Sequence, residues 1–417
     1  MELLLLSIIA IILIIFTIIN NRFGVFLILF ILCSLLMGTA TLVSDYAIFN
    51  IYIDILIVLI FFSIILLINN RKVFYFHKND LLRFSLWIPF IILLFVRSNF
   101  FTNYEVAKPI IFSLLIIFFF FIFPNVIRVV TWERFNKLFI KLLISFGFIQ
   151  FILFVTNPQV SIVEIWLNPQ FARFEYAEYL NPIWLARTFS IAAIASLIFL
   201  NGKVKVSFYI FFVLATVLTA SRGPLLVLMI ISLIYYIVNY KNKINYIKFS
   251  ISLILSVFVI TFLYLTNIVG EYFTNIFLRS HSSLFEAFFN TNKVGGRGNL
   301  LLESINLIKS NLIFGIGTGR FKEYTTILYP HNLMLEIFVE LGLIGFILFI
   351  LAISLRNWRI NKSPYIYLVI LSSGNALLSG DINGNKEFFL FLSLMLLHNN
   401  IIISRYKQKR INGVVIN

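Results

Sequence analysis

The chain contains 417 residues, of which 61% are hydrophobic and 12% are charged, and its mean hydropathy is +1.00. This number of polar groups is too small to cover the surface of a soluble protein of this length. The composition therefore excludes a water-soluble globular protein. The net charge of +16 does not indicate nucleic acid as a partner, because most Lys and Arg residues lie in short gaps between apolar segments and form no basic stripe on a soluble domain.

Apolar segments long enough to cross a bilayer recur along the whole chain. A helix of roughly 18 to 20 apolar residues spans the hydrocarbon layer and satisfies its own backbone hydrogen bonds there. We therefore predict an all-α, polytopic integral membrane protein, with residues 1–417 forming one membrane domain of about 12 or 13 transmembrane helices. The predicted spans, in chain order, are 3–20, 23–43, 47–69, 82–97, 109–124, 137–156, 183–200, 206–221, 223–239, 249–268, 332–353, 364–380 and 388–404.

One long apolar segment is interrupted at Ser221-Arg222-Gly223-Pro224. This interruption divides the segment into two helices or kinks a single helix.

The gaps between spans alternate between basic and poorly basic, which predicts their sides of the membrane. Basic gaps are typical of the cytoplasmic side, so the C-terminal tail is predicted to be cytoplasmic. The two longest polar segments, 157–182 and 269–331, then lie outside, the second before the third-last span. Thirteen spans put the N-terminus outside, and twelve put it inside. The basic residues of the cytoplasmic set include Arg71, Lys72, Lys78, Arg128, Arg134, Lys203, Lys205, Lys241, Lys243, Arg356, Arg359, Arg405 and Lys407.

The second outer segment contains two local patterns. Apolar residues near helical spacing between Leu300 and Leu312 predict a short amphipathic helix at the outer membrane surface. The following Gly315-Ile316-Gly317-Thr318-Gly319-Arg320 stretch lacks the Gly-Lys-Ser/Thr ending of a nucleotide loop, so we interpret it as a flexible turn.

Arginines on the predicted outer side are candidates for holding an anionic group. Arg187 lies near the start of a span, Arg222 follows Ser221 between two spans, and Arg297 lies among glycines. A guanidinium fork matches phosphate oxygens in a bidentate manner, and neighbouring glycines allow a close approach. The alternative is that each arginine anchors its helix at the interface or pairs with an outer carboxylate. For a single isolated arginine we favour anchoring or pairing, but three arginines on one face suggest an anionic headgroup site. For Arg222, which interrupts an apolar segment beside Gly223-Pro224, we favour the phosphate-binding role, with Ser221 in support.

His331 is the candidate catalytic residue. It stands where the second outer segment enters a helix, followed by Asn332, and Glu336 and Glu340 share one face of that helix. An imidazole titrates near neutral pH and accepts a proton from a sugar hydroxyl. The alternative is that His331 only caps the helix. Asn332, Glu336 and Glu340 are predicted to support the site.

Metal and cofactor signatures are not visible in the sequence. Zinc-ligand spacing and a Ser/His/Asp order are missing, so a metal-independent mechanism without a cofactor is the expectation. His281 is a weaker candidate for the catalytic role.

The order of these motifs resembles the O-antigen polymerase and ligase family over about residues 181–345. The stretches that carry the resemblance are Asn181-Pro182 with Ala186-Arg187, Ser221-Arg222-Gly223, Gly296-Arg297-Gly298, Asn311-Leu312-Ile313-Phe314-Gly315 and His331-Asn332 with Glu340-Leu341-Gly342. The resemblance implies a metal-independent, inverting glycosyltransferase of the bacterial cytoplasmic membrane. Its substrates would be undecaprenyl-diphosphate-linked glycans on the outer face, with Arg222 and Arg297 on the diphosphate and His331 assisting the attacking hydroxyl.

Three activities are compatible with this reading. A polymerase joins lipid-linked repeat units, and its expected partners are those oligosaccharides, membrane lipids and a chain-length regulator protein. A ligase transfers the lipid-linked polysaccharide to lipid A core. We favour the polymerase, because the Asn, Lys, Ile and Phe bias is typical of AT-rich, strain-variable polysaccharide genes. A lipid-linked glycan flippase or other transporter is the third reading, but its internal pseudo-symmetry is not visible.

Overall fold

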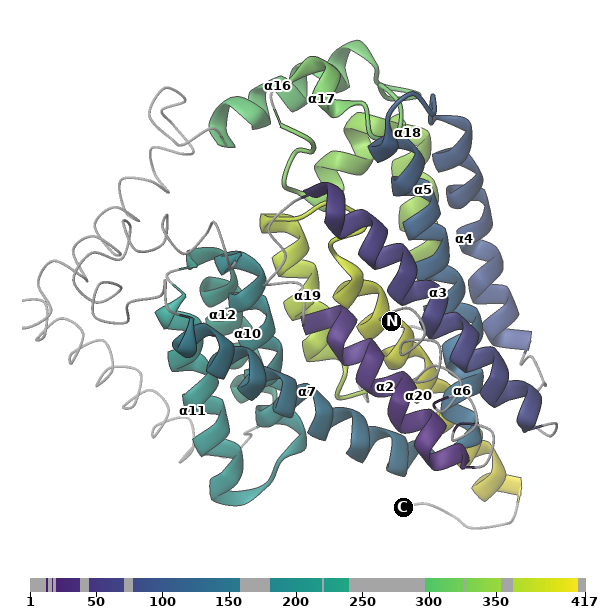
Figure 1. Ribbon diagram of the computed structural model, residues 1–417, viewed down its shortest axis with the longest axis vertical. Helices are drawn as coiled ribbons and strands as arrows, with labels where there is room; N and C mark the ends of the chain where they lie inside the picture. The colour runs from purple at the N-terminus through teal and green to yellow at the C-terminus, as the bar shows by residue number, and fades with distance from the viewer. Residues whose placement is uncertain are drawn as a thin grey trace, which may run out of the picture. The chain divides into compact units, whose positions relative to one another are not determined.

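The computed structural model describes residues 13, 17, 20–37, 45–70, 78–157, 181–219, 221–239, 297–325, 327–353 and 363–411. These residues form helices and connecting loops and contain no strand, which confirms the predicted all-α class. The elements are α2 Asn21–Met37, α3 Asp45–Asn69, α4 Lys78–Val96, α5 Asn103–Ile116, the π-helix η2 Ile117–Ile122, α6 Phe123–Val129, α7 Trp132–Thr156, α10 Pro182–Phe199, α11 Gly202–Leu218, α12 Arg222–Asn239, α16 Arg297–Ser310, α17 Phe321–Tyr324, α18 Leu333–Ile353, α19 Ile366–Leu378 and α20 Lys386–Ile411 (Figure 1).

Each predicted span that the structure describes overlaps a helix, although the helix ends differ from the predicted ends by up to several residues. The predicted spans 3–20 and 249–268, and the polar segment between 158 and 180, lie outside the described residues. The helices long and apolar enough to cross a membrane are Lys78–Val96, Asn103–Val129, Trp132–Thr156, Pro182–Phe199 and Leu333–Ile353, and shorter apolar helices accompany them. The protein is therefore a polytopic membrane protein.

The structure decides between the two alternatives for the interruption at Ser221 and confirms a helix after residue 297. The interruption at Ser221 separates two helices, because α11 ends at Leu218 and α12 begins at Arg222. The carbonyl oxygen of Ser221 accepts a hydrogen bond from the backbone N–H of Leu225 at 3.4 Å, so a new helix starts there. The apolar pattern after residue 297 forms the helix α16.

The chain divides into two compact units. Unit 1 comprises residues 1–39, 44–146 and 307–417, and unit 2 comprises residues 40–43 and 147–306. In unit 2, α10 packs on both α11 and α12. Gly147 allows close packing there, because a Cβ atom at this position would lie 2.9 Å from Ala192 Cβ and 2.8 Å from the Phe212 ring.

An aromatic cluster around Trp87 forms the core of unit 1. Trp87 and its ring neighbours come from α4, α5, η2, α18 and α20, and most of the ring pairs meet edge to face, as aromatic quadrupoles favour. The neighbouring rings are Phe90, Phe112, Phe120, Phe349 and Phe389, at centroid distances between 5.5 and 6.1 Å. This cluster joins the helices whose ends carry the polar residues described below.

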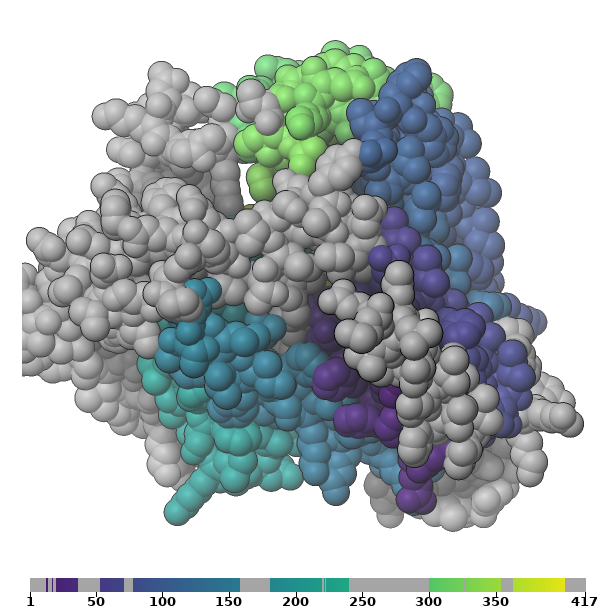
Figure 2. Space-filling model, in the orientation of Figure 1, coloured from purple at the N-terminus to yellow at the C-terminus, as the bar shows by residue number. Residues whose placement is uncertain are grey.

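The opposite side of α4 exposes apolar side chains. Leu82, Ile92 and Val96 are 57%, 56% and 72% exposed, and α4 lies at the right-hand surface of the view in Figure 2. Large aliphatic side chains exposed along a whole helix face are unfavourable in water and favourable against lipid tails.

A π-helix interrupts the long membrane helix between α5 and α6. Pro124 lies at the beginning of α6 and lacks a backbone N–H, so a regular α-helical ladder cannot continue through it. Phe123 N–H therefore bonds to the carbonyl of Phe118. The hydroxyl of Ser393 on α20 donates to the carbonyl of Phe119 at 2.5 Å, which satisfies a carbonyl group that the interruption leaves available.

Charged residues at one end of unit 1 join the beginning of α4, the end of α6 and α20. Asp80 forms ion pairs with Arg83 and Arg128. Arg83 also donates to the side chain of Asn400 at 3.0 Å. This arginine-rich end is the one predicted to face the cytoplasm.

Candidate functional site

His331 occupies a strained turn immediately before α18. Its φ angle is 57°, in the left-handed region that is uncommon for residues other than glycine and that asparagine, aspartate and histidine adopt more often than the rest. Its ring meets the ring of Tyr329 edge to face, with 4.6 Å between centroids. Such strain is often retained at functional positions, so the backbone supports the interest in this histidine.

Asn332, and not His331, caps α18. The side-chain oxygen of Asn332 accepts a hydrogen bond from Leu335 N–H at 3.0 Å, which is the bond that an N-cap residue makes. Its carbonyl accepts from Glu336 N–H at 2.9 Å, and its amide nitrogen donates to the Leu377 carbonyl at 2.7 Å. The alternative in which His331 only caps the helix is therefore wrong.

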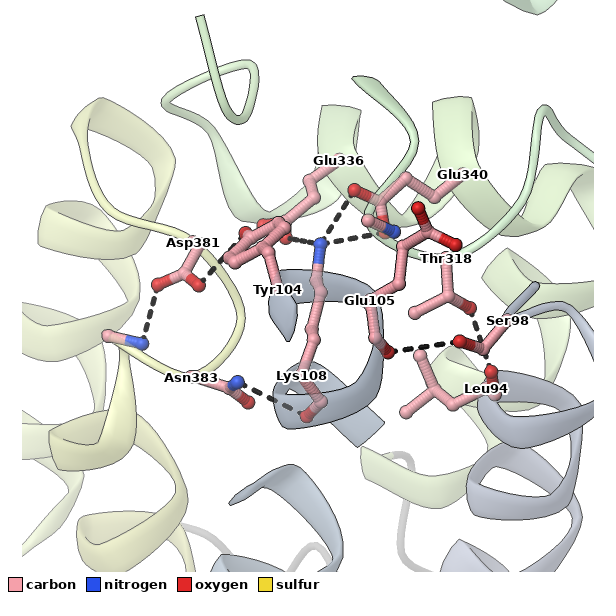
Figure 3. A network of polar contacts seen from close by, with 12 residues as sticks. Leu94, Ser98, Tyr104, Glu105, Lys108, Thr318, Glu336, Glu340, Asp381 and Asn383 are labelled. Atoms are coloured by element: carbon pink, nitrogen blue, oxygen red, sulfur yellow. Dashed lines mark hydrogen bonds and ion pairs between the residues drawn. The ribbon is translucent and has the colours of Figure 1, made fainter. Parts of the chain in front are cut away.

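Glu336 and Glu340 point to a common partner, the ammonium group of Lys108 on α5 (Figure 3). Lys108 forms an ion pair with Glu336 and donates to both carboxylate oxygens of Glu340, at 2.6 and 2.7 Å. All three side chains are buried, each residue being 1% exposed. The prediction that the glutamates share one face is confirmed, and their partner is a residue that the motif analysis missed.

A break in α18 lies directly after these glutamates. Gly342 has φ 65° and ψ −163°, so the helical hydrogen-bond ladder stops there. The carbonyls of Val339 and Glu340 instead accept from the N–H groups of Ile316 and Gly317, both at 2.9 Å.

The Gly315–Gly319 loop is consequently a fixed element, and its interpretation as a flexible turn is wrong. Its residues are buried, and Glu340 also accepts from Gly319 N–H at 2.9 Å. The end of α4 contributes as well: Arg97 donates to the Gly315 carbonyl at 2.9 Å, and its own carbonyl accepts from Thr318 N–H at 3.0 Å. The glycines were interpreted as a sign of flexibility. Their positive φ values instead allow the backbone to turn tightly at these positions.

Arg320 ends this loop on the exposed side. It donates to Glu323 at 2.9 and 2.6 Å, and this hydrogen bond raises the pKa of the Arg320 guanidinium. Arg320 is therefore engaged with a neighbouring carboxylate.

The turn between α19 and α20 closes the other side of the cluster. Asn383 donates to the Lys108 carbonyl at 3.1 Å, and the Tyr104 hydroxyl donates to Asp381 at 3.3 Å. Asp381 in turn accepts from Gly384 N–H at 2.7 Å. The beginnings of α5, α18 and α20 thus share one buried polar network, the Lys108 network, which comprises Tyr104, Lys108, Gly319, Glu336, Glu340, Asp381 and Asn383.

The predicted arginines lie in unit 2, whereas His331 lies in unit 1. Arg187 on α10 is 2% exposed, with its guanidinium carbon 4.5 Å from the Trp184 ring centroid. Arg222 and Arg297 are the first residues of α12 and α16. Ser221, immediately before α12, is buried. That the arginines and His331 form one site stays a prediction.

A metal centre finds no support among the residues that the structure describes, since no group of three or more His, Cys, Asp or Glu side chains there has a suitable arrangement. The chemistry available at the described end of unit 1 is that of an imidazole beside a buried, charged network.

A comparison with known families adds the decisive observation. Residues 207–350 match the family model described as O-antigen ligase. The resemblance to the O-antigen polymerase and ligase family is confirmed. A search of curated proteins finds no match. The O-antigen ligase match includes Arg222, Arg297, His331, Glu336 and Glu340, whereas Lys108 and Arg187 lie outside it.

Proposed function

We propose that this protein is a polysaccharide polymerase that joins undecaprenyl-diphosphate-linked oligosaccharide repeat units on the outer face of the bacterial cytoplasmic membrane. The observation that carries the proposal is the O-antigen ligase match, which spans Arg222, Arg297 and His331. That family consists of glycosyltransferase-like enzymes that use lipid-linked glycans. A chain-length regulator protein is a further proposed partner.

The leaving group explains the proposed role of the arginines. Glycosyl transfer breaks the bond between the anomeric carbon and the diphosphate oxygen, so negative charge grows on the lipid diphosphate. Guanidinium groups stabilise that charge through bidentate hydrogen bonds. Arg222 and Arg297 each begin a helix, where unpaired backbone N–H groups also favour an anion. Charge and backbone donors at both positions would act together on the diphosphate.

His331 acts on the other substrate in this proposal. The acceptor hydroxyl oxygen forms a bond to the anomeric carbon from the face opposite the diphosphate, which inverts the configuration. The hydroxyl proton passes to the imidazole, and undecaprenyl diphosphate leaves with the electron pair of the broken bond. The strained turn at His331 supports this role, because it fixes the ring at the beginning of α18 without using it as a cap.

The glycans of a deletion strain distinguish polymerase activity from ligase activity. Loss of a polymerase should leave lipid A core capped with one repeat unit, as measured by mass spectrometry. Loss of a ligase should instead leave lipid-linked polymer that is not attached to the core. The latter result would replace the polymerase by the ligase.

Reconstitution of the purified protein in vesicles distinguishes an enzyme from a transporter. Purified protein in vesicles should lengthen lipid-linked repeats without an ion gradient or nucleotide, and the His331→Asn variant provides the matched negative control. Movement of lipid-linked glycan without any new glycosidic bond would favour the transporter.

A further inference from the structure

We propose that Lys108 is a positioning residue for glycosyl transfer, which holds the beginning of α18 and the Gly315–Gly319 loop in the arrangement that orients His331. This inference rests on the proposed function, but it starts from a residue outside the O-antigen ligase match. Lys108 would act through its two glutamates and not by touching the substrate.

The first argument is the connection from Lys108 to His331. Glu336, one of the two carboxylates on Lys108, lies one turn into α18, and its backbone N–H bonds to the Asn332 carbonyl. His331 immediately precedes Asn332. Any rotation or sliding of the first turn of α18 would therefore move the left-handed turn that carries the imidazole.

The second argument is that Lys108 also fixes the loop. Glu340 accepts simultaneously from the ammonium of Lys108 and from Gly319 N–H. The N–H groups of Ile316 and Gly317 in the loop then donate to carbonyls of α18 before Gly342. Beyond Gly342, Leu343 N–H donates to the carbonyl of Leu312, which lies just before the loop. The ammonium group of Lys108 thus connects α5 both with α18 and, through Glu340, with the Gly315–Gly319 loop.

The third argument concerns energy. A buried ion pair is often no more stabilising than well-packed apolar side chains, because each charge loses its hydration. Packing alone would be served by apolar residues at these positions. A charged network at the end of the bundle is better suited to fixing one arrangement among several, which is the requirement for orienting a catalytic group.

The first experiment measures position without relying on activity. Hydrogen–deuterium exchange of the purified protein is compared for Lys108→Met and for Lys205→Met, a matched control in which the lysine contacts only Tyr235 among the described contacts. Lys108→Met should raise exchange roughly tenfold in peptides covering 315–319 and 331–341, and leave 388–397 unchanged. Unchanged exchange in the first two peptides overturns the inference.

Loss of Lys108 also leaves two buried carboxylates without a cation, so the single variant is accompanied by a neutral one. Lys108→Met combined with Glu336→Gln and Glu340→Gln removes that repulsion. Its thermal stability should recover, while exchange in 315–319 and 331–341 stays raised. Wild-type exchange in this triple variant would mean that Lys108 only balances charge, and would overturn the inference.

The second experiment asks whether Lys108 acts through His331. Lys108→Met should lower kcat about 10- to 100-fold, the effect of displacing a catalytic group by about 1 Å, with little change in KM for the lipid-linked donor. In a His331→Asn background the same substitution should have almost no further effect on kcat. An equal loss in both backgrounds contradicts positioning through His331. Full activity of His331→Asn alone instead removes the catalytic role of His331 from the proposed function, whatever the exchange data show.

Discussion

Lys108 and Glu340 are 232 positions apart in the chain, yet the ammonium group of one donates to both carboxylate oxygens of the other. Glu340 additionally accepts from Gly319 N–H, so three hydrogen bonds from two donor groups converge on this one side chain. A carboxylate can serve all of them, because it carries only acceptors.

Glu340→Gln should therefore destabilise the protein although it preserves the shape of the side chain. The amide nitrogen would replace either Oε1, which accepts from Lys108, or Oε2, which accepts from both Lys108 and Gly319 N–H. In either orientation at least one buried hydrogen bond is lost, at a cost of about 1 to 3 kcal/mol. Thermal unfolding in detergent measures the effect. Glu303→Gln on the exposed side of α16 is the matched control and should stay within about 0.5 kcal/mol of wild type. Equal stability of the two variants would contradict the importance of the shared acceptor.

His331→Asn should lower turnover by roughly 10² to 10⁴, the usual contribution of a positioned acid or base. Asparagine tolerates the left-handed backbone better than most residues and leaves the cap at Asn332 in place, so folding should be nearly unaffected. Polymer formed from purified lipid-linked repeats is measured at matched protein abundance. Asn332→Ala is the complementary variant, which should lose about 1 kcal/mol of stability through the cap. Normal turnover of His331→Asn would remove the general base.

Arg222→Ala and Arg297→Ala should each abolish polymer formation while protein abundance stays near normal. Lysine at either position should restore only part of the activity, because a point charge lacks the planar fork that matches diphosphate. The measurement is polymer length on gels together with immunodetection of the protein. If both alanine variants made normal polymer, the arginines would not hold the diphosphate.

Gly342→Ala should destabilise the protein more than Gly202→Ala. Both glycines have a positive φ, 65° and 64°, so alanine is strained at either position, by about 1 to 2 kcal/mol in a left-handed helical conformation. The ψ of −163° at Gly342 places this residue in a region that is essentially restricted to glycine. At Gly202 the new Cβ atom would meet nothing within 4 Å, whereas at Gly342 it would lie 2.4 Å from the Ile313 carbonyl oxygen. Overlap should add about 1 to 3 kcal/mol at Gly342. Thermal unfolding of the two variants provides the comparison, and similar midpoints would argue against close packing at the break.

The predicted orientation is tested with topology reporters. A reporter fused after Lys243 or at the C-terminus should be cytoplasmic, and one inserted near Asn292 should be outside, because the basic gaps mark the inner side. The opposite result would move the candidate site to the cytoplasmic face.

Hydropathy was sufficient to predict the helices, because apolar length is a direct requirement of the bilayer. The helical face shared by Glu336 and Glu340 also followed from their spacing. Lys108 was missed for an identifiable reason. The predicted span began at residue 109, one position after Lys108, whereas α5 begins at Asn103. A span starting at Asn103 would have marked Lys108 as an intramembrane charge that requires a partner.

The Gly315–Gly319 loop was misread because local composition does not reveal distant hydrogen-bond partners. The N–H groups of Ile316 and Gly317 bond to carbonyls that become available only because α18 breaks at Gly342, and that of Thr318 bonds to the Arg97 carbonyl at the end of α4. A glycine-rich stretch is flexible in isolation, and here the tertiary structure decides otherwise.

The π-helix between α5 and α6 changes the direction in which the second half of this membrane helix presents its side chains, relative to the first half. An additional residue in a helical turn rotates everything beyond it by about 100° relative to an uninterrupted α-helix. Before η2 the helix presents Lys108 to the glutamates of α18, and after it the helix presents Arg128 to Asp80. Removing one residue from Ile117–Ile122 would delete the additional residue of the π-helix and leave the length and hydropathy of the membrane helix almost unchanged. It would nevertheless turn one of these two ionic ends away from its partner, so the register of this single helix couples the Lys108 network at one end to the Asp80 ion pairs at the other.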